Sequence, residues 1–179
     1  MPVSYTNRKG LTFFLCQGVS KSGKPRYFFS KNPAQNTLEG IPTGYHIEES
    51  VNAVVSLVKD RKQLILPEEI QLVKSPLERH PKGNNYRVSA KGKQIIVYER
   101  LYSQQDIPDG MRTMLDKNAQ YSPMLRFNLV NASSRTFCAE RIMYVSSLPD
   151  WIDIGDCGLL KGLVKEIIPL LDSDEYFEL

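Results

Sequence analysis

Residues 11–30, LTFFLCQGVSKSGKPRYFFS, decide the fold of the first part of the chain. Two aromatic, β-prone runs, at 11–19 and 25–30, are joined by a short polar loop that contains Gly23. This order is typical of a β-hairpin. Apolar residues lie on both sides of the first strand, with Leu11, Phe13 and Leu15 on one side and Phe14 and Cys16 on the other. We therefore expect both of its faces to be covered.

Three further antiparallel strand pairs are predicted from β-prone runs bounded by turn signals. They are 44–50 with 53–59 around a turn at Val51 and Asn52, 85–90 with 93–102 around a two-residue turn at Lys91 and Gly92, and 122–130 with 134–145. Hairpins that follow one another in this way favour an α+β fold over alternating strands and helices.

Helices are predicted at three places. Pro67 in a first turn begins a short helix that is disturbed at Pro76. The first turn of this helix is acidic, with Glu68 and Glu69. Ile70, Val73 and Leu77 are apolar and lie at helical spacing. A second short helix is expected to start near Asp109. Asp156 is a good N-cap for a third helix over 157–168, whose broad apolar stripe ends before Pro169.

These elements predict one domain, residues 1–179, with the basic N-terminal hairpin region 1–58 as a candidate subdomain. Its fold class is α+β, with a mostly antiparallel sheet built from hairpins. The short central helix and the C-terminal amphipathic helix are expected to pack on that sheet.

One resemblance is carried by residues 7–30, NRKGLTFFLCQGVSKSGKPRYFFS, together with 41–50, IPTGYHIEES, and the C-terminal stretch 174–179, DEYFEL. The first fifty residues are similar to a group of uncharacterised prokaryotic proteins with a T-aromatic-aromatic-L run followed by a TGKPRY-like hairpin. The resemblance implies that the hairpin and the strand after it form a recurring unit. It implies no activity and assigns no functional residue.

The three cysteines, Cys16, Cys138 and Cys157, are odd in number, widely spaced and without a CxxC pair. This spacing predicts three free thiols, with neither a disulfide framework nor a zinc site, and a reducing compartment. The N-terminal residues lack a signal-peptide pattern, and no apolar stretch reaches the 18 or more residues of a membrane helix. We expect a cytoplasmic location and no membrane partner; the oligomeric state is left open.

Enzymatic activity is the second hypothesis, with a site around His46, His80 or Cys157. The sequence has no nucleophile motif, no phosphate-binding glycine loop and no metal-ligand set, so no cofactor and no metal are predicted. A single histidine without a convergent partner motif is more often a packing or surface residue. The chain is therefore expected to be a non-enzymatic binding protein, with an enzyme of unrecognised type as the alternative.

The basic N-terminal hairpin is the predicted contact surface. Residues 1–38 contain six basic and no acidic residues, whereas 150–179 contain eight acidic and two basic residues. Cations interleaved with aromatic rings suit phosphate contacts and base stacking. The predicted contact residues are Arg8, Lys9, Lys21, Lys24, Arg26, Tyr27 and Lys31. Nucleic acid and a protein partner both remain candidates for this surface.

Overall fold

A computed structural model describes residues 1–33, 36–101, 115–145 and 148–179. The chain divides into an N-terminal unit, residues 1–61 with 104–119, and a C-terminal unit, residues 62–103 with 120–179. Both units are built on antiparallel strands, and helices are added in the C-terminal unit, so the predicted α+β class is confirmed. The expected helix start at Asp109 lies outside the described residues.

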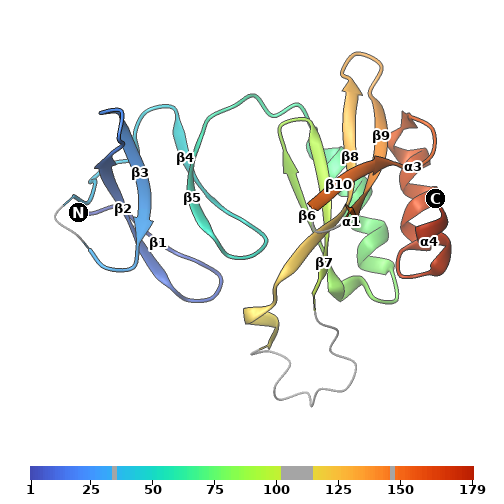
Figure 1. Ribbon diagram of the computed structural model, residues 1–179, viewed down its shortest axis with the longest axis horizontal. Helices are drawn as coiled ribbons and strands as arrows, with labels where there is room; N and C mark the ends of the chain where they lie inside the picture. The colour runs from blue at the N-terminus through green and yellow to red at the C-terminus, as the bar shows by residue number, and fades with distance from the viewer. Residues whose placement is uncertain (34–35, 102–114, 146–147) are drawn as a thin grey trace. The chain divides into compact units, whose positions relative to one another are not determined.

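The N-terminal unit contains the hairpin that the sequence predicts (Figure 1). Strand β2 (Thr12–Val19) pairs with β3 (Pro25–Ser30), and β1 (Ser4–Thr6) pairs with the start of β2. Strands β4 (Tyr45–Glu49) and β5 (Val55–Lys59) form the second predicted pair, as a separate two-stranded sheet.

Few side chains of this unit are buried, and one of them is polar. Leu15 and Cys16 are fully enclosed on the two faces of β2. Asn7 is buried and donates its amide to the carbonyl of Ala53 at 2.8 Å, while its own side-chain oxygen accepts from the backbone of Lys9 and Leu11. A polar tie of this kind fixes the turn after β1 against the turn before β5, because a buried amide is stable only when it is hydrogen-bonded.

The C-terminal unit is based on a larger antiparallel sheet, with strand order β10–β9–β8–β7–β6 and β11 pairing with β9 (Figure 1). Its strands are β6 (Tyr86–Lys91), β7 (Gln94–Arg100), β8 (Tyr121–Asn131), β9 (Thr136–Val145), β10 (Leu148–Asp153) and β11 (Gly158–Leu159). The β6–β7 turn differs from the prediction by one residue, because Lys91 pairs with Gln94 and leaves Gly92, at a φ of 61°, and Lys93 in the turn.

Helices cover one face of this sheet. They are α1 (Pro67–Arg79), α3 (Leu160–Ile167) and α4 (Asp174–Glu178), with short 3₁₀ turns η1 (Gly83–Asn85) and η2 (Ile168–Leu170). Val73 and Leu77 of α1 and Leu163 and Ile167 of α3 are buried in one core with side chains from the sheet, including Phe127. The predicted packing of both helices on the sheet is confirmed.

Both helices differ from the prediction at one end. Helix α1 continues through Pro76 to Arg79 because Leu77, in its last turn, is buried in the core. A proline there removes one helical hydrogen bond, and the burial of Leu77 offsets that loss. Helix α3 begins at Leu160 with Leu159 as its N-cap, so the prediction of Asp156 as the N-cap is wrong.

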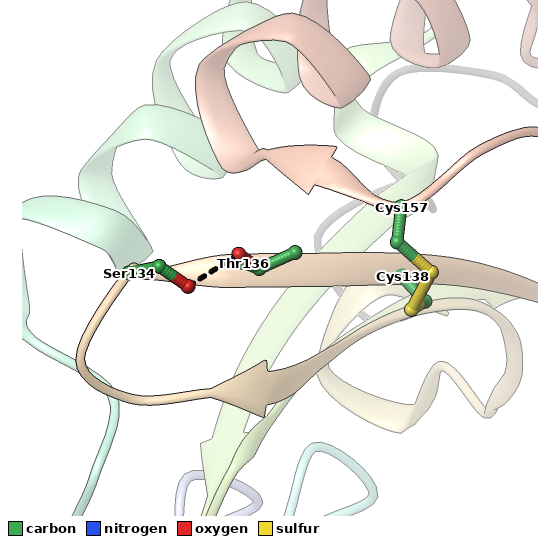
Figure 2. The surroundings of a disulfide bond; sticks show 4 residues. All are labelled: Ser134, Thr136, Cys138 and Cys157. Carbon is green, nitrogen blue, oxygen red and sulfur yellow. Dashed lines mark hydrogen bonds between the residues drawn. A yellow bond between two sulfur atoms is a disulfide. The ribbon is translucent and has the colours of Figure 1, made fainter.

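The prediction of three free thiols is also wrong, because Cys138 and Cys157 form a disulfide (Figure 2). In the β9–β11 register Gly158 lies opposite Phe137, so Cys157, one residue earlier, lies beside Cys138. The bridge therefore fixes the segment that leads into α3 against β9. Cys16 is free and buried.

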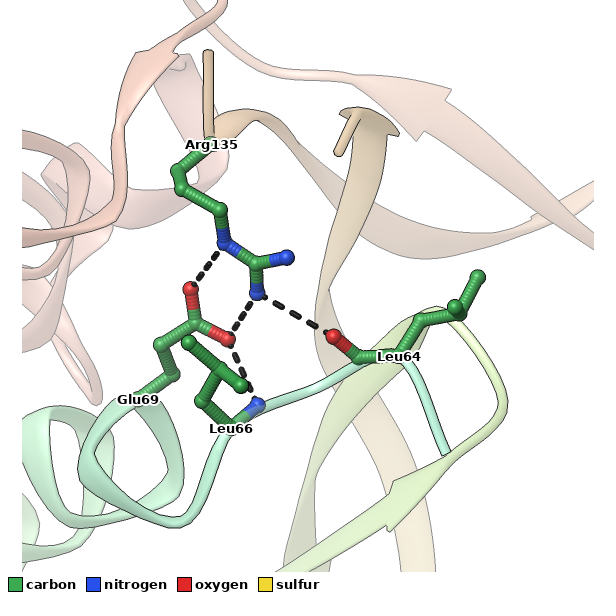
Figure 3. A network of polar contacts seen from close by, with 4 residues as sticks. All are labelled: Leu64, Leu66, Glu69 and Arg135. Carbon is green, nitrogen blue, oxygen red and sulfur yellow. Dashed lines mark hydrogen bonds and ion pairs between the residues drawn. The ribbon is translucent and has the colours of Figure 1, made fainter. Parts of the chain in front are cut away.

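A buried ion pair ties the start of α1 to the β8–β9 turn (Figure 3). Glu69 is 6% exposed, and Arg135 donates to both of its carboxylate oxygens, from Nε at 2.8 Å and from Nη2. Glu69 also accepts the backbone N–H of Leu66 at 2.8 Å, which closes the first turn of α1. Because a buried carboxylate is stable only with partners, this network fixes where α1 begins on the sheet.

Candidate functional site

The tip of the β2–β3 hairpin is an ordered turn that carries exposed cations. Ser20 organises it, since its hydroxyl donates to the carbonyl of Lys24 at 2.9 Å and accepts from the Lys24 backbone N–H at 3.1 Å. Gly23 has a φ of +76°, a conformation that glycine adopts without strain. Lys21 and Lys24 are exposed on either side of it. The backbone is therefore fixed while the charged side chains remain in solvent.

Arg26 and Phe28 extend this cationic tip along one face of β3. Residues two apart on a strand share a face, so Arg26 and Phe28 lie on the same side of the sheet. Their partners on β2 are Gly18 and Cys16. Phe28 is 43% exposed, so part of its ring is accessible to a partner. Gly18 leaves room for it, since a Cβ at Gly18 would lie 3.4 Å from the Phe28 ring.

Tyr27 points to the opposite face, so it does not lie on the surface that carries Arg26. Its ring packs edge-on against Tyr45 of β4, with ring centroids 5.6 Å apart. Tyr27 is half-buried there. Tyr27 is one of the contact residues predicted from the sequence, and it lies on the covered face of β3, whereas Phe28 lies on the exposed face. Because side chains alternate between the two faces of a strand, the sequence alone places Phe28 on the same face as Arg26.

The other predicted cations lie apart from the hairpin tip. The Arg8 guanidinium donates to the carbonyl of Val51, and the Arg8 backbone N–H donates to Glu49 at 3.1 Å. Lys9 is half-buried, and Lys31 is exposed just beyond the far end of β3. Five residues separate Lys31 from Arg26, which is about 17 Å along an extended strand. Lys21 and Lys24 of the hairpin tip and Arg26 and Phe28 of β3 are exposed and follow one another along the hairpin, and we call these four residues the basic face.

The cations of the basic face are electrostatically free within the part of the chain that the structure describes. Lys21, Lys24 and Arg26 form no ion pair with any described residue, whereas five other ion pairs, such as that of Glu69 with Arg135, join described groups. Unpaired cations on a rigid hairpin leave their full charge available to an anionic partner.

The three residues of the enzyme hypothesis lie in separate places. His46 Nδ1 is 2.6 Å from Asp60 Oδ1, but both side chains are more than half exposed, at 53% and 57%. His80 ends α1, accepts the Lys82 backbone N–H at 3.2 Å and packs edge-on against Tyr86. Cys157 is bonded to Cys138 and has no thiol. None of these arrangements joins a nucleophile, a base and an enclosed pocket among the described residues.

Among the described residues, no three His, Cys, Asp or Glu side chains lie close enough together to hold a metal ion. The described helices also include none long and apolar enough to cross a membrane.

Comparisons of the chain with protein-family models, with curated proteins and with solved structures found no match. The interpretation of the basic face therefore depends on its own geometry and charge.

Proposed function

We propose that the protein binds single-stranded nucleic acid through the basic face of its N-terminal unit. The observation that carries the proposal is the exposed Phe28 ring on the same strand face as Arg26, on the strand that leads away from the turn of Lys21 and Lys24. Cations neutralise phosphates, and an exposed aromatic ring provides a platform on which an unpaired base can stack.

The geometry supports a single strand more than a duplex. Base stacking on a protein side chain requires an unstacked base, which a single strand offers without disrupting base pairs. The basic face is a turn and one strand side, and no helix contributes to it. Groove reading by a recognition helix is therefore not the mode that the basic face supports.

A ring-truncation experiment tests this proposal. In a fluorescence anisotropy titration with a labelled mixed-sequence DNA 15-mer, Phe28→Ala should weaken binding by about 1–3 kcal/mol, the usual contribution of one stacked base. Val19→Ala is the matched control, because Val19 is 74% exposed on the same hairpin and lies on the opposite strand face. Equal losses of affinity in the two variants, or no loss in either, would refute a stacking role for Phe28.

A protein partner with an acidic surface is the outcome to expect if the wild-type protein binds neither DNA nor RNA at low salt. Such a partner would contact the same cations, since charge complementarity does not depend on the chemical class of the anion. The ring-truncation pair would then be repeated with that partner.

The cytoplasmic location predicted from the sequence also stays a proposal. The Cys138–Cys157 disulfide makes it testable, because cytosolic reductants keep most thiols reduced. Acid quenching of living cells followed by alkylation would report the thiol state in place. Both cysteines recovered as free thiols would support the cytoplasm, and a fully formed bridge would favour an oxidising compartment.

A further inference from the structure

A groove runs between two helices of the C-terminal unit, far along the sequence from the basic face. One wall is a strip of α1 formed by Glu68, Gln71, Leu72, Ser75, Pro76 and Arg79. The other wall is formed by Lys161, Val164 and Lys165 of α3 and by Pro169 of η2. The spacing in each wall is three or four residues, so each wall is a single helical face. The groove encloses about 760 Å³.

The floor of the groove is apolar and partly open to solvent. Leu72 is 38% exposed although it is a leucine in the middle of α1, whereas Val164 is buried. Pro76 and Pro169 add rigid apolar rings on the two walls. Apolar side chains of a bound helix can cover such a strip.

The rim of the groove is mainly cationic. Arg79, Lys161 and Lys165 line it, against the single acid Glu68. Within the described ranges, neither Lys161 nor Lys165 forms an ion pair. An occupant with an apolar stripe and acidic flanks would therefore contact the floor and neutralise the rim together.

We propose that this groove binds an acidic, amphipathic helical segment of a partner protein. The α1 wall extends from Glu68 to Arg79, about 16 Å at the rise of an α-helix, which matches three turns of a bound helix. Apolar side chains of that helix at positions i, i+4 and i+7 would contact Leu72, Pro76 and Val164. Its acidic side chains would lie next to Arg79, Lys161 and Lys165.

The first measurement compares two synthetic peptides with the full-length protein. Each is a labelled 15-residue helix with leucine at i, i+4, i+7 and i+11; one carries glutamate at the remaining exposed positions and the other carries lysine. Fluorescence anisotropy should show the acidic peptide binding at least tenfold more tightly at low salt, with the preference reduced as salt rises. Equal affinity for both peptides, or preference for the basic one, would overturn the proposal.

Charge reversal locates the binding. The variant Lys161→Glu/Lys165→Glu should lose the acidic-peptide preference and bind the basic peptide at least tenfold better than the wild type does. The matched control Lys91→Glu/Lys93→Glu makes the same charge change on exposed side chains at the β6–β7 turn, away from the groove lining. If this control changes the preference as much as the groove variant does, the effect is one of net charge and the groove is not the site.

A third variant tests the apolar floor. Leu72→Ser should weaken the acidic peptide at least fivefold while circular dichroism shows unchanged folding, because Leu72 is already partly exposed. Unchanged peptide affinity would remove the floor from the site and contradict the proposal. Binding of decanoate vesicles or free fatty acid without binding of the acidic peptide would also contradict it, since the groove would then accept a lipid chain instead of a helix.

Discussion

In the C-terminal unit Phe127, Phe137 and Leu125 are fully enclosed within one large core, whereas in the N-terminal unit only Leu15 and Cys16 reach the same state among the described residues. The large unit encloses several of its rings, although Phe177 and Tyr144 remain exposed, whereas the small unit leaves Phe28 43% exposed on the strand that carries Arg26. The contrast indicates that the enclosed core that stabilises the fold lies mainly in the C-terminal unit.

The largest effect should come from the core of the C-terminal unit. Phe127→Ala should cost about 3–5 kcal/mol of unfolding free energy, because it removes a fully buried ring and leaves a cavity. Val130→Ala on the same strand is the control, since Val130 is 52% exposed, and it should change stability by less than about 0.5 kcal/mol. Urea titration of both variants would settle the difference. Similar losses would mean that Phe127 is not packed as the structure has it.

The disulfide should contribute the next largest effect. Cys138 and Cys157 are 19 residues apart in sequence. Closing a loop of that size lowers the conformational entropy of the unfolded chain, which raises the free energy of unfolding by about 3 kcal/mol. Cys138→Ser should therefore lower stability by about 2–4 kcal/mol under non-reducing conditions, and adding a reductant should lower the wild type to a similar value. Thiol labelling of the wild type, denatured without reductant, should recover one thiol, that of Cys16. Recovery of three thiols would contradict the bridge.

A smaller effect is expected from Glu99, whose partial burial is the main cause that raises its pKa, with the nearby Asp172 charge adding to it and Lys82 opposing it. A carboxyl whose folded pKa is raised holds its proton more tightly in the folded state. Its contribution to stability is therefore complete below the unfolded pKa and is lost as pH rises through the folded pKa.

Glu99→Gln removes that loss, because glutamine stays neutral. Relative to the wild type, the variant should gain stability as pH rises from about 4 toward 7, with the gain levelling off above the folded pKa of Glu99. Denaturant titrations at several pH values would measure this difference. A difference that is constant with pH would show that Glu99 titrates as it does in the unfolded chain.

The strand pairs were largely predictable from the sequence because hairpins are local. Alternation within 11–30, together with Gly23, was enough to place β2 and β3 within a residue or two. Helix α1 was predicted from the spacing of Val73 and Leu77, although its passage through Pro76 depends on burial in the core and not on local preference.

Long-range features were not predictable. The Cys138–Cys157 bridge depends on β11 pairing with β9, and β11 contains only Gly158 and Leu159. Strand β10 contains Pro149 and two aspartates and lies at the edge of its sheet, where proline is tolerated, so it has no strong strand pattern.

The contact residues named from the sequence stay a prediction, and the structure adds how they are arranged on the hairpin. Alternation places Tyr27 and Phe28 on opposite faces of β3, but the sequence does not show which face is covered. Tyr45, from another sheet, contacts Tyr27 and leaves Phe28 as the exposed ring. Which side of a two-sided apolar strand faces solvent is decided by tertiary packing.

The smallest change in stability is expected from the variant Lys21→Ala/Lys24→Ala/Arg26→Ala. The same variant tests nucleic-acid binding by the basic face most directly. These side chains are exposed and without ion pairs to described residues, so the triple change should alter unfolding free energy by less than about 0.5 kcal/mol per site. Lys74→Ala/Lys91→Ala/Lys93→Ala, with three exposed lysines of the C-terminal unit, is the control of equal net charge.

The decisive measurement is the dependence of single-stranded DNA affinity on salt concentration for the wild type and these two variants. Each phosphate contact on a single strand contributes about 0.7 to the slope of log affinity against log salt. The basic-face variant should lose about 2 units of slope magnitude, and the control variant should keep the wild-type slope. An unchanged slope in the basic-face variant, or no measurable binding of the wild type at low salt, would show that the basic face does not bind single-stranded DNA through phosphate contacts.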